Sequence, residues 1–506
     1  MALLGSIDFS LEDLEKNVLN TSVTPQIFAA MAGDDAVLAE EAAVCIKNLM
    51  TNEHLGSKCT RRLYALCIFP LINQILDRIL NDSSVVVSPN FLEAVAVQIW
   101  CIASTIPVAL PQITASPLAA LVSKRLSVFD ASNVTVLPAE NALLQALLVA
   151  VEDNEQLARN LAQMNPQFLS VSFDSSSIKF DALHMNILLR LMCFVQIARC
   201  VPGSASALNL PAILNFLLAT LQTALPESSL FESDASAVKG FFEIYEMSAE
   251  LLELLVIENS KALKGHSLDS FLELPFALAS YFSANFQRNF HEEGNNDRIR
   301  LVRRIFSIIG TLLTTQEQLI ISGILKVSRG ALFVQRMERV LSLVASSPSE
   351  DFNLCDEVSG WLRAWLTAWG ESDYPEIPEN FFQTFISSFY SSSSPVVLTN
   401  TCALSALLIP YAPESAQKDF CVYLNNLLCT DPFDADHLEV LLAAIDGVTG
   451  IFDPQSKEWP AKPLNELKND LKVAKERLSA VACIDLSMKE IVADRIRSVD
   501  RIYRIL

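Results

Sequence analysis

Apolar residues recur every three to four positions through most of this chain, and runs that alternate between apolar and polar residues are almost absent. A period near 3.6 residues is typical of amphipathic helices. Proline, serine, asparagine and aspartate separate the periodic runs, as is usual at helix ends. Four such runs in the first half predict helices over residues 40–50, 93–104, 140–154 and 187–202.

These four helices return at similar intervals. With Asn48, Cys101, Ala150 and Gln196 as markers, the intervals are 53, 49 and 46 residues. Armadillo and HEAT units repeat at roughly 40–47 residues, so these would be such units with longer loops. A single repeat helix cannot bury its apolar face alone and has to stack on its neighbours. We therefore predict an all-α fold, an α-α superhelix of armadillo repeats followed by HEAT-like repeats.

The later part of the chain continues the helical pattern. A chain of 506 residues is too long for one compact core, which stops growing near 250–300 residues. Further helices are predicted over 240–259, 297–315 and 434–453, before a basic amphipathic tail. The predicted organisation is armadillo-like repeats over 1–225, a short loop over 226–239, HEAT-like repeats over 240–456 and basic capping helices over 457–506.

Some residues of these helices carry a structural expectation of their own. Trp361, Trp365 and Trp369 share one helix face, and a stripe of this kind is more often part of the core than a binding surface. Asp436 is expected to cap the helix that follows it. The eleven cysteines have irregular spacing and no CxxC pair, so they are interpreted as small buried apolar residues in a reducing compartment.

Two long stretches without charged residues, 94–123 and 380–413, raise the question of a membrane. Pro107, Pro111 and Pro117 interrupt the first, and prolines and a run of serines interrupt the second. Neither offers about 20 uninterrupted apolar residues, so buried helices joined by proline turns are predicted, with no membrane. The first residues have no basic segment ahead of an apolar core, and a signal peptide is not expected.

The formal net charge is −21. Such a chain is a poor candidate for general binding of nucleic acid, which requires a positive surface, and it suits a strongly basic partner. The charge is uneven, because residues 457–506 carry eleven Lys or Arg against eight Asp or Glu, whereas the first 456 carry 26 against 50.

The last helix of each armadillo unit lines the groove of the array, where an Asn side chain can pair with an extended peptide. In the first unit Asn48 lies one helical turn from Val44 and can face outward, although it can equally well do no more than end a helix. The second unit has Trp100 or Cys101 in its place, so a regular ladder of asparagines is missing. The predicted partner-binding residues are Asn48, Gln98, Trp100, Glu152, Asn154, Gln196 and Arg199.

No catalytic, cofactor or metal site is predicted. The sequence contains no P-loop, GxGxxG, GxSxG or HExxH motif. The five histidines are scattered, and acid pairs such as Asp34–Asp35 and Glu40–Glu41 are interpreted as helix starts, where the helix dipole favours negative charge. An enzyme is therefore not expected.

The order of the helical blocks resembles that of the symportin family, also called HEAT repeat-containing protein 3. The nearest local matches are VEDNEQLARNL, 151–161, and the end of the fourth helix, IARCVP. The remaining blocks follow the family in sequence order over most of the chain: 34–50, 95–104 and 438–453.

The resemblance implies an adaptor and chaperone for the basic ribosomal proteins that accompany 5S ribosomal RNA, acting in nuclear import and ribosome biogenesis. It implies a cytoplasmic and nuclear location, an import receptor as a possible second partner, and a monomer. This chain lacks the family's basic N-terminal tail and has only about a dozen residues where the family carries a long acidic insertion, which puts transport of two cargoes in doubt. The alternative is a general armadillo/HEAT scaffold for protein–protein interaction with no ribosomal link.

Overall fold

In the computed structural model the described residues form helices and the turns between them, with no strand among them. The chain divides after α14 into two compact units. The described residues are 15–19, 22–82, 87–127, 135–152, 155, 158–159, 180–201, 203, 210–222, 235–259, 294–314, 337, 340–341, 352–369, 377, 379–390, 392–432, 434–452, 459, 464–481 and 489–506.

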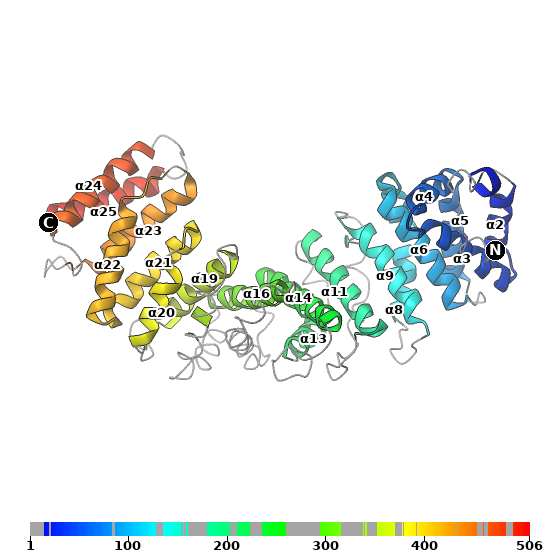
Figure 1. Ribbon diagram of the computed structural model, residues 1–506, viewed down its shortest axis with the longest axis horizontal. Helices are drawn as coiled ribbons and strands as arrows, with labels where there is room; N and C mark the ends of the chain where they lie inside the picture. Colours follow the sequence, from blue (N-terminus) through cyan, green and yellow to red (C-terminus); the bar gives the residue numbers. More distant parts are fainter. Residues whose placement is uncertain are drawn as a thin grey trace. The chain divides into compact units, whose positions relative to one another are not determined.

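The first unit is built around a row of helices that lie side by side: α3 packs on α6, α6 on α9, α9 on α11, and α11 on α14 (Figure 1). Shorter helices cover this row, with α2 and α4 on α3, α8 on α9 and α13 on α14. The elements are η2 (Glu15–Leu19), α2 (Val23–Ala32), α3 (Ala36–Met50), α4 (Gly56–Ala65), α5 (Ile68–Asn81), α6 (Pro89–Thr105), η3 (Pro107–Ala109), α7 (Leu110–Thr114), α8 (Leu118–Ser127), α9 (Leu137–Val151), α11 (Ala182–Cys200), α13 (Leu210–Gln222) and α14 (Ala235–Glu258).

The second unit repeats this arrangement: α16 packs on α19, α19 on α21, α21 on α23, and α23 on α25, with α20, α22 and α24 beside the row. Its elements are α16 (Gly294–Thr314), α19 (Phe352–Trp369), α20 (Glu379–Phe389), α21 (Pro395–Leu408), η7 (Ile409–Tyr411), α22 (Glu414–Leu428), α23 (Ala435–Ile451), α24 (Leu464–Val481) and α25 (Lys489–Ile505).

The helices predicted from the periodicity are all present, but some boundaries differ. The helix predicted from Glu40 begins at Ala36, because the Asp35 side chain caps it and accepts hydrogen bonds from the backbone N–H groups of Val37 and Leu38, both at 3.1 Å. At the start of α23 the cap is Asp434, which accepts from the backbone N–H of His437 at 2.9 Å, and the assignment of this role to Asp436 was wrong.

The boundary between the two units lies later than the predicted end of the first repeats. Helix α14 packs on α11 and α13 and belongs to the first unit, although the sequence placed residues 240–259 with the later repeats. The last five residues of the loop predicted over 226–239 are helical, and the others lie outside the described residues. The assignment of armadillo or HEAT character to each part stays a prediction.

The tryptophan stripe of α19 lies in the core, as predicted. Trp361 and Trp365 are buried, and their rings stack with centroids 6.4 Å apart. Phe306 of α16 lies against Trp361 at 4.8 Å between centroids, so the stripe joins two neighbouring helices of the row. The Trp369 side chain lies outside the described residues.

Most of the described cysteines also behave as core residues. The thiols of Cys45, Cys59, Cys101, Cys193, Cys402 and Cys421 are buried, whereas those of Cys67 and Cys429 are exposed. Burial raises the pKa of the Cys101 thiol to about 11 and that of Cys193 to about 12. A raised pKa keeps a thiol protonated at neutral pH and therefore unreactive.

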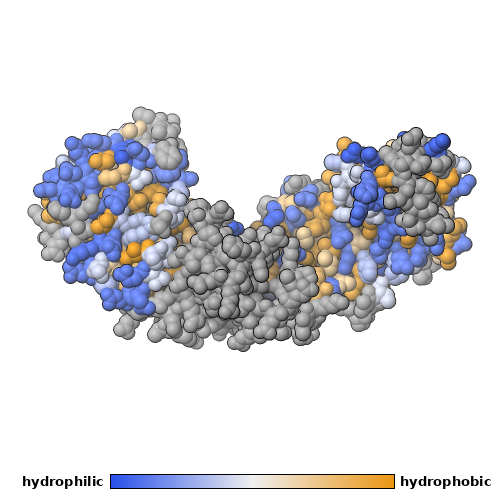
Figure 2. Space-filling view, in the orientation of Figure 1, coloured by the Kyte–Doolittle hydropathy of each residue, from blue (hydrophilic) through white to orange (hydrophobic). Residues whose placement is uncertain are grey.

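The basic tail helices dock on the end of the second unit. Leucine and valine side chains of α24 and α25 are buried, and Arg495 pairs with Asp446 of α23 at 2.8 Å. Arg477 similarly lies 3.4 Å from Asp431. On the face shown in Figure 2, hydrophilic residues cover much of the described surface of this end of the unit. This arrangement fits the expected capping role, because a terminal repeat needs one polar face.

Close packing at one interhelical turn gives a testable consequence. Gly56 begins α4, and a Cβ atom there would clash with the backbone carbonyl oxygen of Met50 at the end of α3. Since backbone cannot move aside as a flexible side chain can, Gly56→Ala is expected to lower the free energy of unfolding by about 1–3 kcal/mol. Chemical denaturation followed by circular dichroism measures the change.

Gly450→Ala is the matched control. Gly450 is exposed in α23, and a Cβ atom there would have the Cβ of Ala406 as its nearest neighbour, at an ordinary 3.8 Å. Alanine favours a helix over glycine by about 1 kcal/mol, so this substitution should be neutral or stabilising. Equal effects of the two substitutions would argue against the close approach at Gly56.

Candidate partner-binding site

An acidic surface pocket of about 410 Å³ lies between α3 and α6 in the first unit. Three of its charged residues are glutamates and one is a lysine, so its net charge is negative. We call it the acidic pocket; it is lined by Glu40, Glu41, Val44, Cys45, Lys47, Asn48, Asn90 and Glu93.

The sequence forms the α3 wall of this pocket in a simple way. Asp35 sets the start of the helix, and the small and apolar residues Ala42, Ala43 and Ile46 are buried on one of its faces. The helical period then leaves Glu41 and Asn48 on the other side, exposed and half-buried respectively. The acid pair at Glu40 and Glu41 thus stands in the second turn of the helix rather than at its start.

Hydrogen bonds fix the carboxylate of Glu40. Ser88 Oγ donates to Glu40 Oε2 at 2.6 Å, and Asn90 Nδ2 donates to Glu40 Oε1 at 3.0 Å. The hydrogen bond from Ser88, which has the larger effect, and that from Asn90 lower the pKa of the Glu40 carboxyl below its ordinary value. Glu40 therefore stays charged at neutral pH while both of its oxygens are engaged by α6 and the residue that caps it.

The other charged groups of the acidic pocket form fewer hydrogen bonds and ion pairs than Glu40. Lys47 Nζ lies 2.9 Å from Glu93 Oε1 and neutralises that carboxylate in part. Glu41 is exposed, and neither its carboxylate nor the Asn48 amide has a side-chain partner among the described residues. The pocket thus offers a free negative charge and a free amide, which suit a cationic side chain and a peptide group, respectively.

Of the predicted partner-binding residues, Asn48 lines this pocket. Trp100 is 40% exposed on α6, which is unusual for a large aromatic residue and leaves its ring available. Glu152 is exposed at the C-terminal cap of α9. Gln196 is half-buried on α11.

The other three predicted partner-binding residues are buried, ion-paired or outside the described residues. Gln98 is 0% exposed, and its Nε2 donates to the Ala43 carbonyl oxygen at 2.9 Å, so it joins α6 to α3 inside the protein and does not fit a role on a groove surface. Arg199 is exposed but forms an ion pair with Glu250 of α14. Asn154 lies outside the described residues.

The prediction from sequence missed Glu41, Asn90 and Glu93 as site residues. Glu40 and Glu41 were noticed but interpreted as a helix start. The available signal was Asp35, because a capping residue at that position moves the helix start four residues earlier and puts both glutamates on the helix wall. Nothing local to α6 indicates that Asn90 and Glu93 face α3.

The described residues also bear on membrane insertion and metal binding. By length and composition, α11 is apolar enough to cross a membrane, and 67% of its apolar window is buried inside the structure, where the helix packs on α9 and α14. The stretch 94–123 covers most of α6, all of η3 and α7, and the first part of α8, with a bend of 117° between α6 and the segment that begins with η3. Within the described ranges, no three His, Cys, Asp or Glu residues are grouped so that they could hold a metal ion.

No family model matches the chain, and no curated protein matches it in sequence. Among solved structures it is similar to a chain from a study of the interaction between cadherin and beta-catenin, with a TM-score of 0.57 and 10% identity over 99% of this chain and 100% of that one. A SYS-1/POP-1 complex (TM-score 0.44, 10% identity, 97% of this chain and 99% of that one) and Kap121p (0.35, 12%, 99% and 52%) are too distant to carry an argument.

The first of these likenesses shows the fold alone. Together with the stacked helical rows, it confirms the predicted class, an all-α solenoid of the armadillo and HEAT type. The comparisons do not connect the chain with the symportin family in particular.

Proposed function

We propose that this protein is a non-catalytic adaptor that holds a basic segment of a partner protein. The observation that carries the proposal is the acidic pocket, where the exposed carboxylate of Glu41 and the unpaired amide of Asn48 lie on α3. Glu93 adds a half-buried carboxylate from α6 that pairs with Lys47. A lysine or arginine side chain complements the carboxylates, and the amide can bond to the backbone of an extended segment. The net charge of −21 would favour the approach of a basic protein over a longer range.

The resemblance to the symportin family supports a finer proposal for the cargo: a ribosomal protein associated with 5S ribosomal RNA. Such a protein is basic, so the electrostatics of the acidic pocket fit it. An adaptor of this kind would act as a monomer between cytoplasm and nucleus, with an import receptor as a further partner. It would bind the protein and leave the nucleic acid to its cargo.

A general protein-interaction scaffold is the second candidate, and the exposed ring of Trp100 favours it. Aromatic side chains of this kind are enriched where proteins bind one another, whatever the charge of the partner. Binding through such a surface would depend little on salt, and this separates the two candidates.

Affinity purification of the full chain from a cell extract, followed by mass spectrometry at about 0.1 M and about 1 M salt, tests the proposal. Raising the salt shortens the Debye length from about 10 Å to about 3 Å and should release a partner held by charge. We expect basic proteins at low salt, 5S-associated ribosomal proteins among them, and their loss at high salt. Recovery of partners that salt does not remove would instead favour the scaffold.

A further inference from the structure

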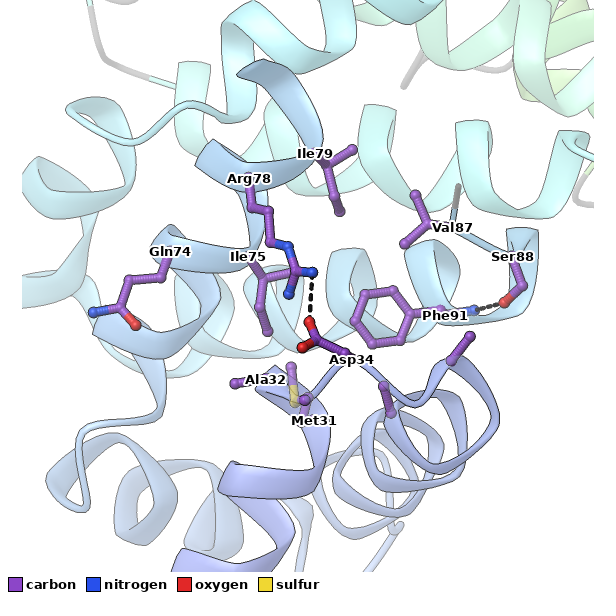
Figure 3. Close-up of a pocket in the computed structure, with 13 residues that line it drawn as sticks. Met31, Ala32, Asp34, Gln74, Ile75, Arg78, Ile79, Val87, Ser88 and Phe91 are labelled. Atoms are coloured by element: carbon purple, nitrogen blue, oxygen red, sulfur yellow. Dashed lines mark hydrogen bonds and ion pairs between the residues drawn. The ribbon is translucent and has the colours of Figure 1, made fainter. Parts of the chain in front are cut away.

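A second pocket, of about 240 Å³, lies beside the acidic pocket in the first unit. Its floor is apolar, because the side chains of Met31, Ala39, Ile75 and Phe91 are buried around it. Figure 3 shows Met31 at the end of α2, Ile75 on α5 and Phe91 at the start of α6 around the pocket. Ala39 of α3 also lines it. We call it the apolar pocket.

The charges at this pocket cancel. Arg78 of α5 extends toward Asp34, and its Nη2 lies 2.7 Å from Asp34 Oδ1 (Figure 3). The Asp34 side chain is 92% exposed, so the pair stands at the solvent side and leaves the floor free of charge. A pocket with an apolar floor and a neutralised mouth favours an uncharged apolar group over an ion.

The size of the apolar pocket is suited to one side chain. An engineered cavity of about 150 Å³ lined by apolar residues is large enough to bind benzene. The volume here, about 240 Å³, exceeds that value, so a leucine, methionine or phenylalanine side chain fits. Burial of such a side chain stabilises a complex. Its replacement by alanine is therefore expected to weaken binding about tenfold.

The two pockets are joined by a hydrogen bond. Ser88 lines the apolar pocket, and its Oγ donates at 2.6 Å to Glu40 of the acidic pocket. On α3, Ala36 and Ala39 line the apolar pocket, and Glu40 and Glu41 line the acidic pocket. Adjacent residues of α3 therefore line both pockets, which is the arrangement that neighbouring side chains of one extended segment would require.

We propose that the two pockets form one bipartite site for a short extended segment of a partner protein, in which an apolar residue stands a few positions from a lysine or arginine. The apolar side chain enters the apolar pocket, and the cation lies at Glu41 and Glu93. This inference rests on the proposed function for its basic half, and it adds a requirement for the apolar half that charge alone does not give.

A random peptide display library, selected on the full chain, tests the site while the natural partner is unidentified. Ala36→Trp fills the apolar pocket from an exposed position, and Val108→Trp places the same ring at an exposed position of η3 that lines neither pocket. Glu41→Lys reverses a charge of the acidic pocket, and Glu53→Lys does so at an exposed position outside it. Thermal melts of all four variants show whether they fold as the unmodified chain does.

We expect the selected peptides to pair an apolar residue with Lys or Arg a few positions away. Changing the apolar residue of a selected peptide to alanine should weaken binding to the unmodified chain and to Val108→Trp about tenfold, measured by fluorescence anisotropy. The same change should have no effect on Ala36→Trp, which already lacks that pocket. Changing the basic residue should weaken binding to the unmodified chain and to Glu53→Lys but not to Glu41→Lys.

The outcomes separate the two proposals. Peptides that are basic only, and that bind Ala36→Trp as tightly as the unmodified chain, would overturn the bipartite site and leave the adaptor for basic segments standing. Peptides that bind Glu41→Lys undiminished would contradict the proposed function. A library that yields nothing sensitive to either variant overturns both.

Discussion

Replacing Glu140 with alanine is expected to lower the free energy of unfolding of the first unit by about 3–5 kcal/mol, the usual cost of removing the carboxylate that compensates a buried positive charge. Glu140 of α9 and Arg190 of α11 are both buried, with 4% and 1% of their surfaces exposed. Burial lowers the pKa of Arg190 to about 10, and the negative charge of Glu140 acts against that shift. Without Glu140, the buried guanidinium of Arg190 loses the nearby negative charge that opposes the effect of burial.

Arg125 of α8 adds to the cost, because its Nε donates to Glu140 Oε1 at 2.6 Å. The measurement is urea denaturation followed by circular dichroism, with the transition of the first unit resolved from that of the second. Adding Arg190→Met to Glu140→Ala removes the buried charge along with its partner, and it should restore much of the lost stability. A loss below about 1 kcal/mol for Glu140→Ala alone would show that water already reaches the pair.

The second large effect concerns binding. Glu41→Lys together with Glu93→Lys should weaken the binding of a basic partner about a hundredfold, because two attractive charges become repulsive ones in the acidic pocket. The second substitution also places a lysine beside Lys47, which now pairs with Glu93. A titration of the purified chain against the basic partner recovered at low salt measures the change.

The control carries the same change in net charge at other places. Glu53 and Glu439 are exposed and lie outside the acidic pocket, in the first and second units. Glu53→Lys with Glu439→Lys should weaken binding only a few-fold, through the smaller net charge. If this control loses as much affinity as the pocket variant, the partner responds to the overall charge and the pocket is not its site.

The helices of both units follow from local sequence. The apolar positions of α3 and α6 recur with the helical period, and capping residues such as Asp35 and Ser88 lie next to them in the chain. Such signals need no information from distant residues, which is why every predicted helix is present. The errors at Glu40 and Asp436 both arose where several acidic residues lie near a helix start, and in each case the cap is an aspartate closer to the N-terminus.

Local sequence predicts the residues of the candidate site less well than it predicts the helices. Asn48 was predicted because armadillo helices share a pattern, and it lines the acidic pocket. Gln98 was predicted for the same groove but lies inside the protein. Its position depends on how α6 is rotated against α3, where the Ala43 carbonyl oxygen accepts its amide. A rotation of one helix about its own axis leaves its periodicity unchanged. The sequence of α6 therefore does not predict how this helix is rotated against α3.

The sequence by itself determined that this protein is a solenoid of helical hairpins with an excess of negative charge, since helix formation and net charge are properties of neighbouring residues and of composition. Only the tertiary structure decided which charges meet. Glu40 and Ser88 stand far apart in the chain, and so do Lys47 and Glu93, yet each pair is joined by the packing of α3 on α6. That packing register is set by side-chain shapes across the whole interface, and the two pockets exist because of it.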